Sequence, residues 1–160
     1  MPRIEPLGDP SEGSSLARIM RRRPEIASAW SALSDTVRFT GLLPNDLKEA
    51  VRASTAGAIG CDFCASIGDG PPSAPDKRTS LAIAVARLIA EDHGSVDEKT
   101  FAVLREEFSE EEIVELLALI CIVCVGGQTF GSVTGVEAAT EEEAEGYRRN
   151  KARRIAEVSP

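Results

Sequence analysis

The chain has 160 residues, 42% hydrophobic and 28% charged, which is enough for one domain with a hydrophobic core. Its formal net charge of −8 argues against nucleic-acid and anionic-membrane binding, because it lacks the basic surplus that neutralises phosphates. Residues 1–30 lack the apolar core of a signal sequence, and the longest apolar run, Leu116 to Gly127, is too short to span a bilayer. We therefore expect a cytoplasmic protein with no nucleic-acid or membrane partner and with thiols reduced at rest.

Most of the chain carries the apolar periodicity of helices, and no segment alternates like a half-buried strand. Residues 1–13, rich in Pro, Gly and charge, are expected to form a loose arm, and residues 14–139 a helical domain. Ile26, Trp30, Leu33 and Val37 recur at helical spacing, which predicts one buried stripe. Helices are predicted over 14–23, 25–39, 47–58, 76–92, 97–108 and from 109 onward, with a short helix at Cys61–Cys64.

The segment after Ser109 is the most apolar part of the chain. Ser109 and Glu112 have the spacing of a capping box, and the helix that follows is apolar nearly all round from Leu116 to Val125. Such a helix is expected to be central and the most buried. Residues 140–160, with acids first and bases later, predict a charged C-terminal helix. The patterns together predict an all-α, single-domain bundle of about seven to eight helices.

Cys61 and Cys64 form a Cys-x-x-Cys motif, whose thiols can close a disulfide within one helical turn. At a helix N-terminus the thiol of Cys61 is expected to have a lowered pKa, with Cys64 resolving it as a disulfide. Asp62 favours the helix but repels a thiolate on Cys61, and its net effect depends on where it points. The alternative is that both cysteines are small apolar core residues.

Glu49 is the candidate proton carrier. It shares a helix face with Ala53, Ala56 and Gly60, whose small size lets another helix approach closely. If the chain reverses after this helix, Glu49 faces Gly68, one turn beyond Cys64, where a carboxylate can accept or relay the thiol proton. The alternative is an ordinary acid in the first turn of a helix.

Cys121 and Cys124 repeat the spacing in the middle of an apolar helix, so we expect both to be core residues. A zinc site built from all four cysteines agrees with the count alone, but zinc-binding pairs usually sit in turns, so no metal is expected. His93, the only histidine, is expected to cap a helix end. It can supply an imidazole only if the fold or a neighbouring subunit brings it beside Cys64.

Three segments resemble the alkylhydroperoxidase-D-like (AhpD-like) and carboxymuconolactone decarboxylase superfamily. They are Gly41-Leu42-Leu43-Pro44-Asn45-Asp46-Leu47-Lys48-Glu49, Gly60-Cys61-Asp62-Phe63-Cys64 and Phe108-Ser109-Glu110-Glu111-Glu112-Ile113-Val114-Glu115-Leu116. The resemblance implies an all-helical homo-oligomer (trimer, hexamer or dimer) with no metal or organic cofactor. It implies catalytic places for Glu49, Cys61 and Cys64, and a partner dithiol that restores the reduced form.

The chain departs from the family pattern where a histidine is expected. The histidine four residues after the second cysteine falls on Gly68, and another sometimes found before that cysteine falls on Phe63. The family's Asn and Arg near the end of the long helix fall within 125–130, where only Gln128 is comparable. A missing acid–base relay costs about 10²–10⁴-fold in rate.

The leading hypothesis is a thiol-dependent antioxidant of the peroxiredoxin type, attenuated by the missing histidine. Its substrate is a hydroperoxide or a disulfide, and its reductant is a dithiol protein. One alternative is a non-catalytic oligomeric binding protein on the same fold. Another is a lyase of the carboxymuconolactone decarboxylase type, whose activity would not need the cysteines.

Overall fold

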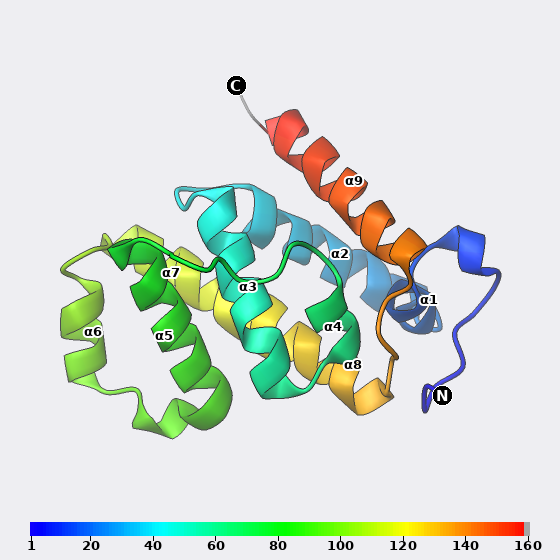
Figure 1. The fold of residues 1–160 in the computed structure, drawn as a ribbon, viewed down its shortest axis with the longest axis horizontal. Coiled ribbons are helices and arrows are strands. Elements are labelled where there is room, and N and C mark those ends of the chain that lie inside the picture. The colour runs from blue at the N-terminus through cyan, green and yellow to red at the C-terminus, as the bar shows by residue number, and fades with distance from the viewer. Residues whose placement is uncertain (159–160) are drawn as a thin grey trace.

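A helix of 25 residues, Glu110–Thr134, crosses the middle of the molecule (Figure 1). The computed structural model describes residues 1–158, which form helices and connecting turns without β-strands. This confirms the predicted all-α fold. The α-helices are α1 (Ser15–Met20), α2 (Pro24–Phe39), α3 (Asn45–Ile59), α4 (Asp62–Ser66), α5 (Lys77–Asp92), α6 (Glu98–Leu104), α7 (Glu110–Ala118), α8 (Gln128–Thr134) and α9 (Glu141–Val158). Short 3₁₀ turns are η1 (Pro10–Glu12) and η2 (His93–Ser95), and a π-helical segment, η3 (Leu119–Gly127), joins α7 to α8.

Local capping explains several helix limits. The predicted capping box of Ser109 and Glu112 is present at the start of α7, with both reciprocal hydrogen bonds. The Asp76 side chain accepts from the Thr79 N–H at the start of α5. Gly60 ends α3 in the left-handed region, with φ 73°, a conformation that glycine adopts without steric cost.

The main core lies where α3, α5 and η3 pack together. Its fully buried members include Val51, Leu116 and Ile120. A second, smaller core cluster surrounds the Cys-x-x-Cys motif, so the cysteines lie inside the fold rather than on its surface. It contains Ile19, Ala56, Cys61, Phe63, Cys64, Ile67 and Val136.

The central helix is less covered than its sequence predicted. By length and composition, Glu110–Thr134 could cross a membrane: its most apolar window has a mean hydropathy of 2.1, and 33% of that window is buried. Val114 and Val133 are 67% and 64% exposed. Within the stretch from Leu116 to Val125, which the sequence predicted to be the most buried, Leu116, Leu119, Ile120, Val123 and Cys124 are buried and Cys121 is exposed.

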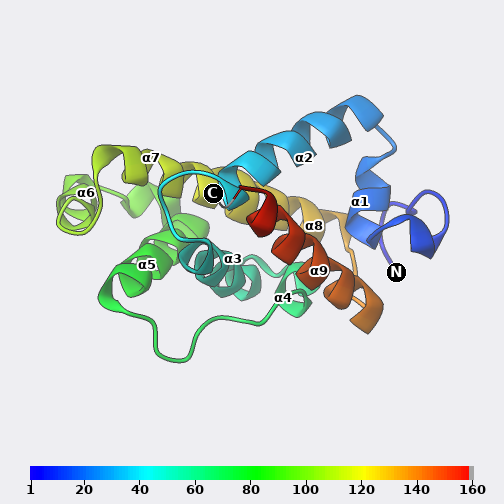
Figure 2. The same ribbon diagram turned by 90° about the horizontal axis from the view of Figure 1, so that it is seen from above.

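The predicted stripe on α2 is wrong at two of its four positions. Val37 is buried and Trp30 half-buried, but Ile26 and Leu33 are 50% and 45% exposed. The N-terminal half of α2 extends beyond the bundle (Figure 2), and Ile26 there is only partly covered. Apolar periodicity predicts a face that can be buried, not the element that buries it.

Both terminal segments fold back onto the bundle. In the N-terminal arm, the Arg3 N–H donates to the Thr134 carbonyl (2.8 Å) and the Arg3 guanidinium to the Val133 carbonyl (2.8 Å). The helix α9 packs on α2 and carries Tyr147 to the region of α3 (Figure 1). The charged tail thus contributes a side chain to the surroundings of Glu49.

Candidate redox site

Cys61 and Cys64 are joined by a disulfide at the start of α4. Gly60 turns the chain at the end of α3, which places Cys61 at the N-cap of α4. The Cys64 N–H donates to the Cys61 sulfur at 3.2 Å. Cys61 is 1% exposed and Cys64 is 6% exposed. The two predicted cysteines are therefore together, and both are almost entirely buried.

Gly131 of α8 packs directly on the disulfide. A Cβ at this position would lie 2.7 Å from the Cys61 sulfur and 3.5 Å from the Cys64 sulfur. The first separation is far below a normal contact, so the helix can approach the disulfide this closely only because residue 131 lacks a side chain.

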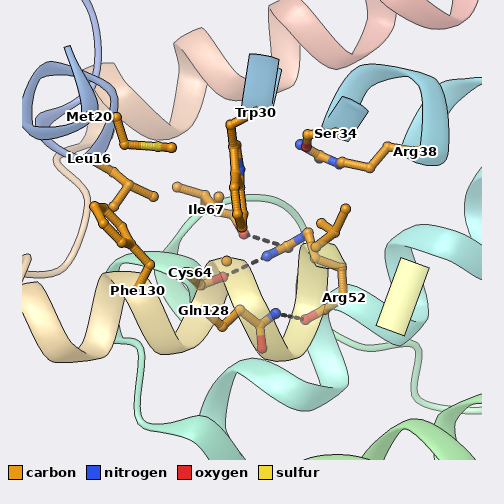
Figure 3. A pocket seen from close by; sticks show the side chains of 12 residues that line it. Leu16, Met20, Trp30, Ser34, Arg38, Arg52, Cys64, Ile67, Gln128 and Phe130 are labelled. Carbon is orange, nitrogen blue, oxygen red and sulfur yellow. Dashed lines mark hydrogen bonds between the residues drawn. The ribbon is translucent and has the colours of Figure 1, made fainter. Parts of the chain in front are cut away.

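A cavity of about 110 Å³ lies beside Cys64 (Figure 3). Its wall is mostly apolar, with a smaller set of polar and charged groups. The residues that line it are Leu16, Met20, Trp30, Ser34, Arg38, Arg52, Cys64, Ile67, Val123, Gly127, Gln128 and Phe130. Cys64 is in this wall and Cys61 is not, so a small molecule in the cavity would meet Cys64 first.

Arg52 connects α3 to the end of α4. It is buried, and its guanidinium donates to the Cys64 carbonyl (2.7 Å) and the Ile67 carbonyl (3.0 Å). Its own carbonyl accepts from the side-chain amide of Gln128 (2.7 Å), whose Oε1 is buried without a partner among the described residues. These contacts fix a permanent positive charge next to Cys64 in the cavity wall.

The Glu49 carboxylate is held by donors on two helices. Arg52 donates to it from Nε (3.1 Å) and from an Nη (2.8 Å), and the Tyr147 hydroxyl donates at 2.8 Å. Burial alone raises the pKa of Glu49, but the hydrogen bonds and charge of Arg52 and the bond from Tyr147 outweigh it, so the pKa is lowered. Glu49 is therefore ionised at neutral pH. Within residues 1–158 no hydrogen bond joins it to either sulfur, and Arg52 links it to the carbonyl of Cys64.

Gly68 lies against Glu49, at the position where the family pattern has a histidine. Its φ is 81°, and a Cβ there would lie 2.6 Å from a Glu49 carboxylate oxygen and 2.9 Å from an Arg52 nitrogen. An imidazole at residue 68 would need the space that these two side chains occupy. The Glu49–Arg52 ion pair thus occupies the space that a histidine side chain at residue 68 would need.

The other two cysteines differ from each other. Cys124 is buried, and burial raises the pKa of its thiol to about 11, so it stays protonated at neutral pH. Cys121 is exposed, so the prediction of two core cysteines is wrong for this one. The cause is η3: a π-helical pitch changes the angle between successive residues, and two cysteines three apart leave the common stripe. His93 is exposed in η2 and is not among the residues that line the cavity beside Cys64.

Sequence reasoning missed four residues of this site. Arg52 follows Glu49 by one helical turn, a spacing that favours an ion pair and could have been recognised. Arg38, Tyr147 and Gly131 come from other helices, and their own segments carry no signal that places them here. Tyr147 is 98 residues from Glu49 in the chain.

Two solved structures of the debrominase Bmp8 resemble this fold. The apo structure aligns with a TM-score of 0.70 over 95% of this chain and 97% of Bmp8. A cysteine-to-alanine variant in complex with 2,3,4-tribromopyrrole aligns with a TM-score of 0.65 over 86% and 82%. The chain has the fold of Bmp8. Sequence identity is 18% in both alignments, so the likeness to Bmp8 concerns the fold.

Bmp8 has an AhpD-like fold, which agrees with the fold expected from the resemblance. No protein-family model matches the chain. No curated protein sequence matches it either.

Proposed function

We propose that the protein is a thiol–disulfide oxidoreductase that reduces small organic hydroperoxides with the Cys61–Cys64 pair. The observation that carries the proposal is the position of the pair: Cys64 lies in the wall of a mostly apolar cavity, next to the buried guanidinium of Arg52. A structural disulfide needs no such cavity, whereas a reactive one needs a place for its substrate.

The reaction begins from the dithiol. Cys64 takes the attacking role that the sequence predicted for Cys61, because Cys64 lines the cavity and Cys61 does not. The Cys64 thiolate attacks the outer oxygen of the hydroperoxide, the O–O bond breaks, and the alcohol leaves after taking a proton. Cys64 is then a sulfenic acid. The Cys61 thiol attacks its sulfur, which releases water and forms the disulfide. An external dithiol returns two electrons and two protons to the pair.

Arg52 is proposed to stabilise the Cys64 thiolate. A fixed cation near a thiol favours its charged form and lowers its pKa. Glu49 then acts as a positioning residue, because its carboxylate holds the guanidinium in place. Its lowered pKa makes it a poor proton donor near pH 7, and the Tyr147 hydroxyl, whose pKa burial raises to about 12, is a weak one as well. We therefore expect slower turnover than a site with an imidazole relay provides.

The proposal includes a partner dithiol protein, a cytoplasmic location and a homo-oligomeric state. The exposed apolar side chains Ile26, Leu33, Val114 and Val133 support the last of these, since a second copy could cover them.

A second candidate is reductive debromination of a small aromatic compound. The fold likeness to a debrominase with bound tribromopyrrole favours it, as do the Trp30 and Phe130 rings in the cavity wall. This reaction also oxidises the two thiols to the disulfide. An aryl bromide and two thiols give the arene, a bromide ion, a proton and the disulfide. Release of bromide from 2,3,4-tribromopyrrole by the reduced protein would distinguish this reaction from peroxide reduction.

The test of the proposal is hydroperoxide consumption by the protein with dithiothreitol as reductant. We expect the Cys64→Ser variant to lose nearly all turnover. Cys61→Ser should still be oxidised at Cys64 but should form no disulfide within the chain, because the resolving thiol is gone. The matched control is Cys121→Ser, which removes an exposed thiol outside the pair and should leave the rate unchanged. Unaltered turnover in Cys64→Ser would refute the proposal. Cysteine-independent activity on an acidic lactone would instead point to the lyase alternative.

A further inference from the structure

The cavity beside Cys64 has two unlike ends (Figure 3). On one side of the Trp30 indole lie the apolar side chains of Leu16, Met20 and Phe130. On the other side lie the guanidinium groups of Arg38 and Arg52. The cavity is therefore amphipathic, with the sulfur-bearing residue Cys64 in the wall between its ends.

The charged end holds hydrogen-bond donors that the protein does not use. Arg38 donates one Nη hydrogen to the Tyr147 hydroxyl. Its guanidinium also lies over the Phe39 and Tyr147 rings, but within residues 1–158 its Nε and other Nη make no hydrogen bond, and neither does the hydroxyl of Ser34. Both residues line the cavity, so these donors are available to a molecule inside it.

The charged end also has an excess of positive charge. Arg38 and Arg52 share one carboxylate: Glu49 is 2.8 Å from Arg52 but 4.0 Å from Arg38. Asp35, the next acid along α2, is paired with Arg154 at 2.6 Å. Lys151, which adds further positive charge near Glu49, is 3.7 Å from Asp69. Arg38 is thus left without a close counter-ion.

We propose that this cavity binds a small organic anion. Its carboxylate accepts hydrogen bonds from Arg38 and Ser34, and its short apolar tail lies between Trp30 and the side chains of Leu16, Met20 and Phe130. The volume of about 110 Å³ suits a short tail of a few carbons. The proposed function extends this to the substrate, which is then an organic hydroperoxide carrying an acidic group; that extension rests on the proposed function.

Trp30 makes the binding measurable without turnover, because it is the only tryptophan of the chain. Its fluorescence can be followed in the oxidised protein during titration with pentanoate and with pentanamide, which has the same number of heavy atoms but no charge. We expect pentanoate to bind at least about tenfold more tightly, as charge-assisted hydrogen bonds are the stronger ones. Equal binding of the two, or no response to either, would overturn the proposal.

Substitutions of Arg38 and Ser34 test whether the anion binds at the charged end of the cavity. Arg38→Met is expected to remove the preference for pentanoate while leaving the affinity for pentanamide unchanged, and Arg38→Lys to restore part of it. Ser34→Ala, which leaves the bond between Arg38 and Tyr147 intact, is expected to reduce the preference severalfold. The matched control is Arg87→Met on α5, an exposed arginine paired with Glu91, which should bind both compounds like the unmodified protein. A preference retained in both Arg38→Met and Ser34→Ala would place the anion elsewhere and contradict the proposal.

The outcome is separate from that of the proposed function. Anion binding with Cys64-independent peroxide consumption would refute the redox role and keep the binding site. Loss of turnover in Cys64→Ser together with equal binding of pentanoate and pentanamide would keep the redox role and refute the anion site.

Discussion

The backbone of Gly131 and the sulfur of Cys61 are in direct contact: a Cβ on residue 131 would lie 2.7 Å from that sulfur. Gly131→Ala should therefore push α8 away from the disulfide. Overpacking of this kind costs about 1–3 kcal/mol in the free energy of unfolding. Urea denaturation of the oxidised protein measures it. The matched control is Gly57→Ala in α3, where a Cβ meets nothing within 4 Å and where alanine favours a helix. A Gly131→Ala protein as stable as the control would contradict the close packing.

Arg52 should control both stability and the acidity of the reduced pair. Arg52→Met leaves Glu49 as a buried carboxylate without its main partner, which costs about 3–5 kcal/mol in the free energy of unfolding. In the same variant the Cys64 thiol should titrate at a higher pH, because the neighbouring cation is gone. Thiolate absorbance against pH measures this in the reduced protein, with Arg87→Met as the control. An unchanged thiol pKa would show that Arg52 has no electrostatic role at the sulfur.

Glu49 should contribute to the loss of folding stability at acid pH. Its pKa is lowered in the folded protein, so its contribution is complete above the unfolded-state value of 4.5 and is lost as the pH falls through the lower folded value. Tyr147→Phe removes one of the hydrogen bonds that lower this pKa. We expect the variant to lose less stability than the unmodified protein as the pH falls below 4.5. Parallel acid limbs in chemical denaturation series would exclude this role of Tyr147.

A histidine at residue 68 should not restore a proton relay. Gly68→His must adopt a positive φ and displace Glu49 and Arg52, so we expect lower stability and no gain in peroxide turnover. Comparison of Gly68→Ala with Gly70→Ala separates the two causes: both residues have positive φ, but a Cβ on Gly70 meets nothing within 4 Å. Gly68→Ala should be the less stable of the two by about 1–3 kcal/mol. A faster Gly68→His enzyme would mean that the site still accepts an imidazole.

The features that sequence predicted well depend on neighbouring residues. The capping box at Ser109 and the pairing of Cys61 with Cys64 follow from groups three residues apart. The all-α class likewise follows from helical periodicity along the chain. Interactions between residues close in sequence determine such features, and the packing of the whole fold does not change them here.

The features that sequence missed depend on distant contacts or on an unusual backbone. The pattern of α2 could not reveal that Ile26 stays 50% exposed. The exposure of Cys121 follows from the π-helical pitch of η3, which its apolar sequence does not predict. Tyr147 reaches Glu49 only because α9 folds back on the bundle. The roles of Glu49, Cys61 and Cys64 in catalysis remain predictions.

The most direct test of the redox account is a single-turnover reaction of the reduced protein with one equivalent of an organic hydroperoxide. The Cys121→Ser variant is the appropriate protein, since it lacks the exposed thiol. The account predicts that peptide mass spectrometry finds a Cys61–Cys64 disulfide, with one alcohol formed per disulfide and Cys124 still reduced. A pair that stays reduced while the hydroperoxide persists would contradict it.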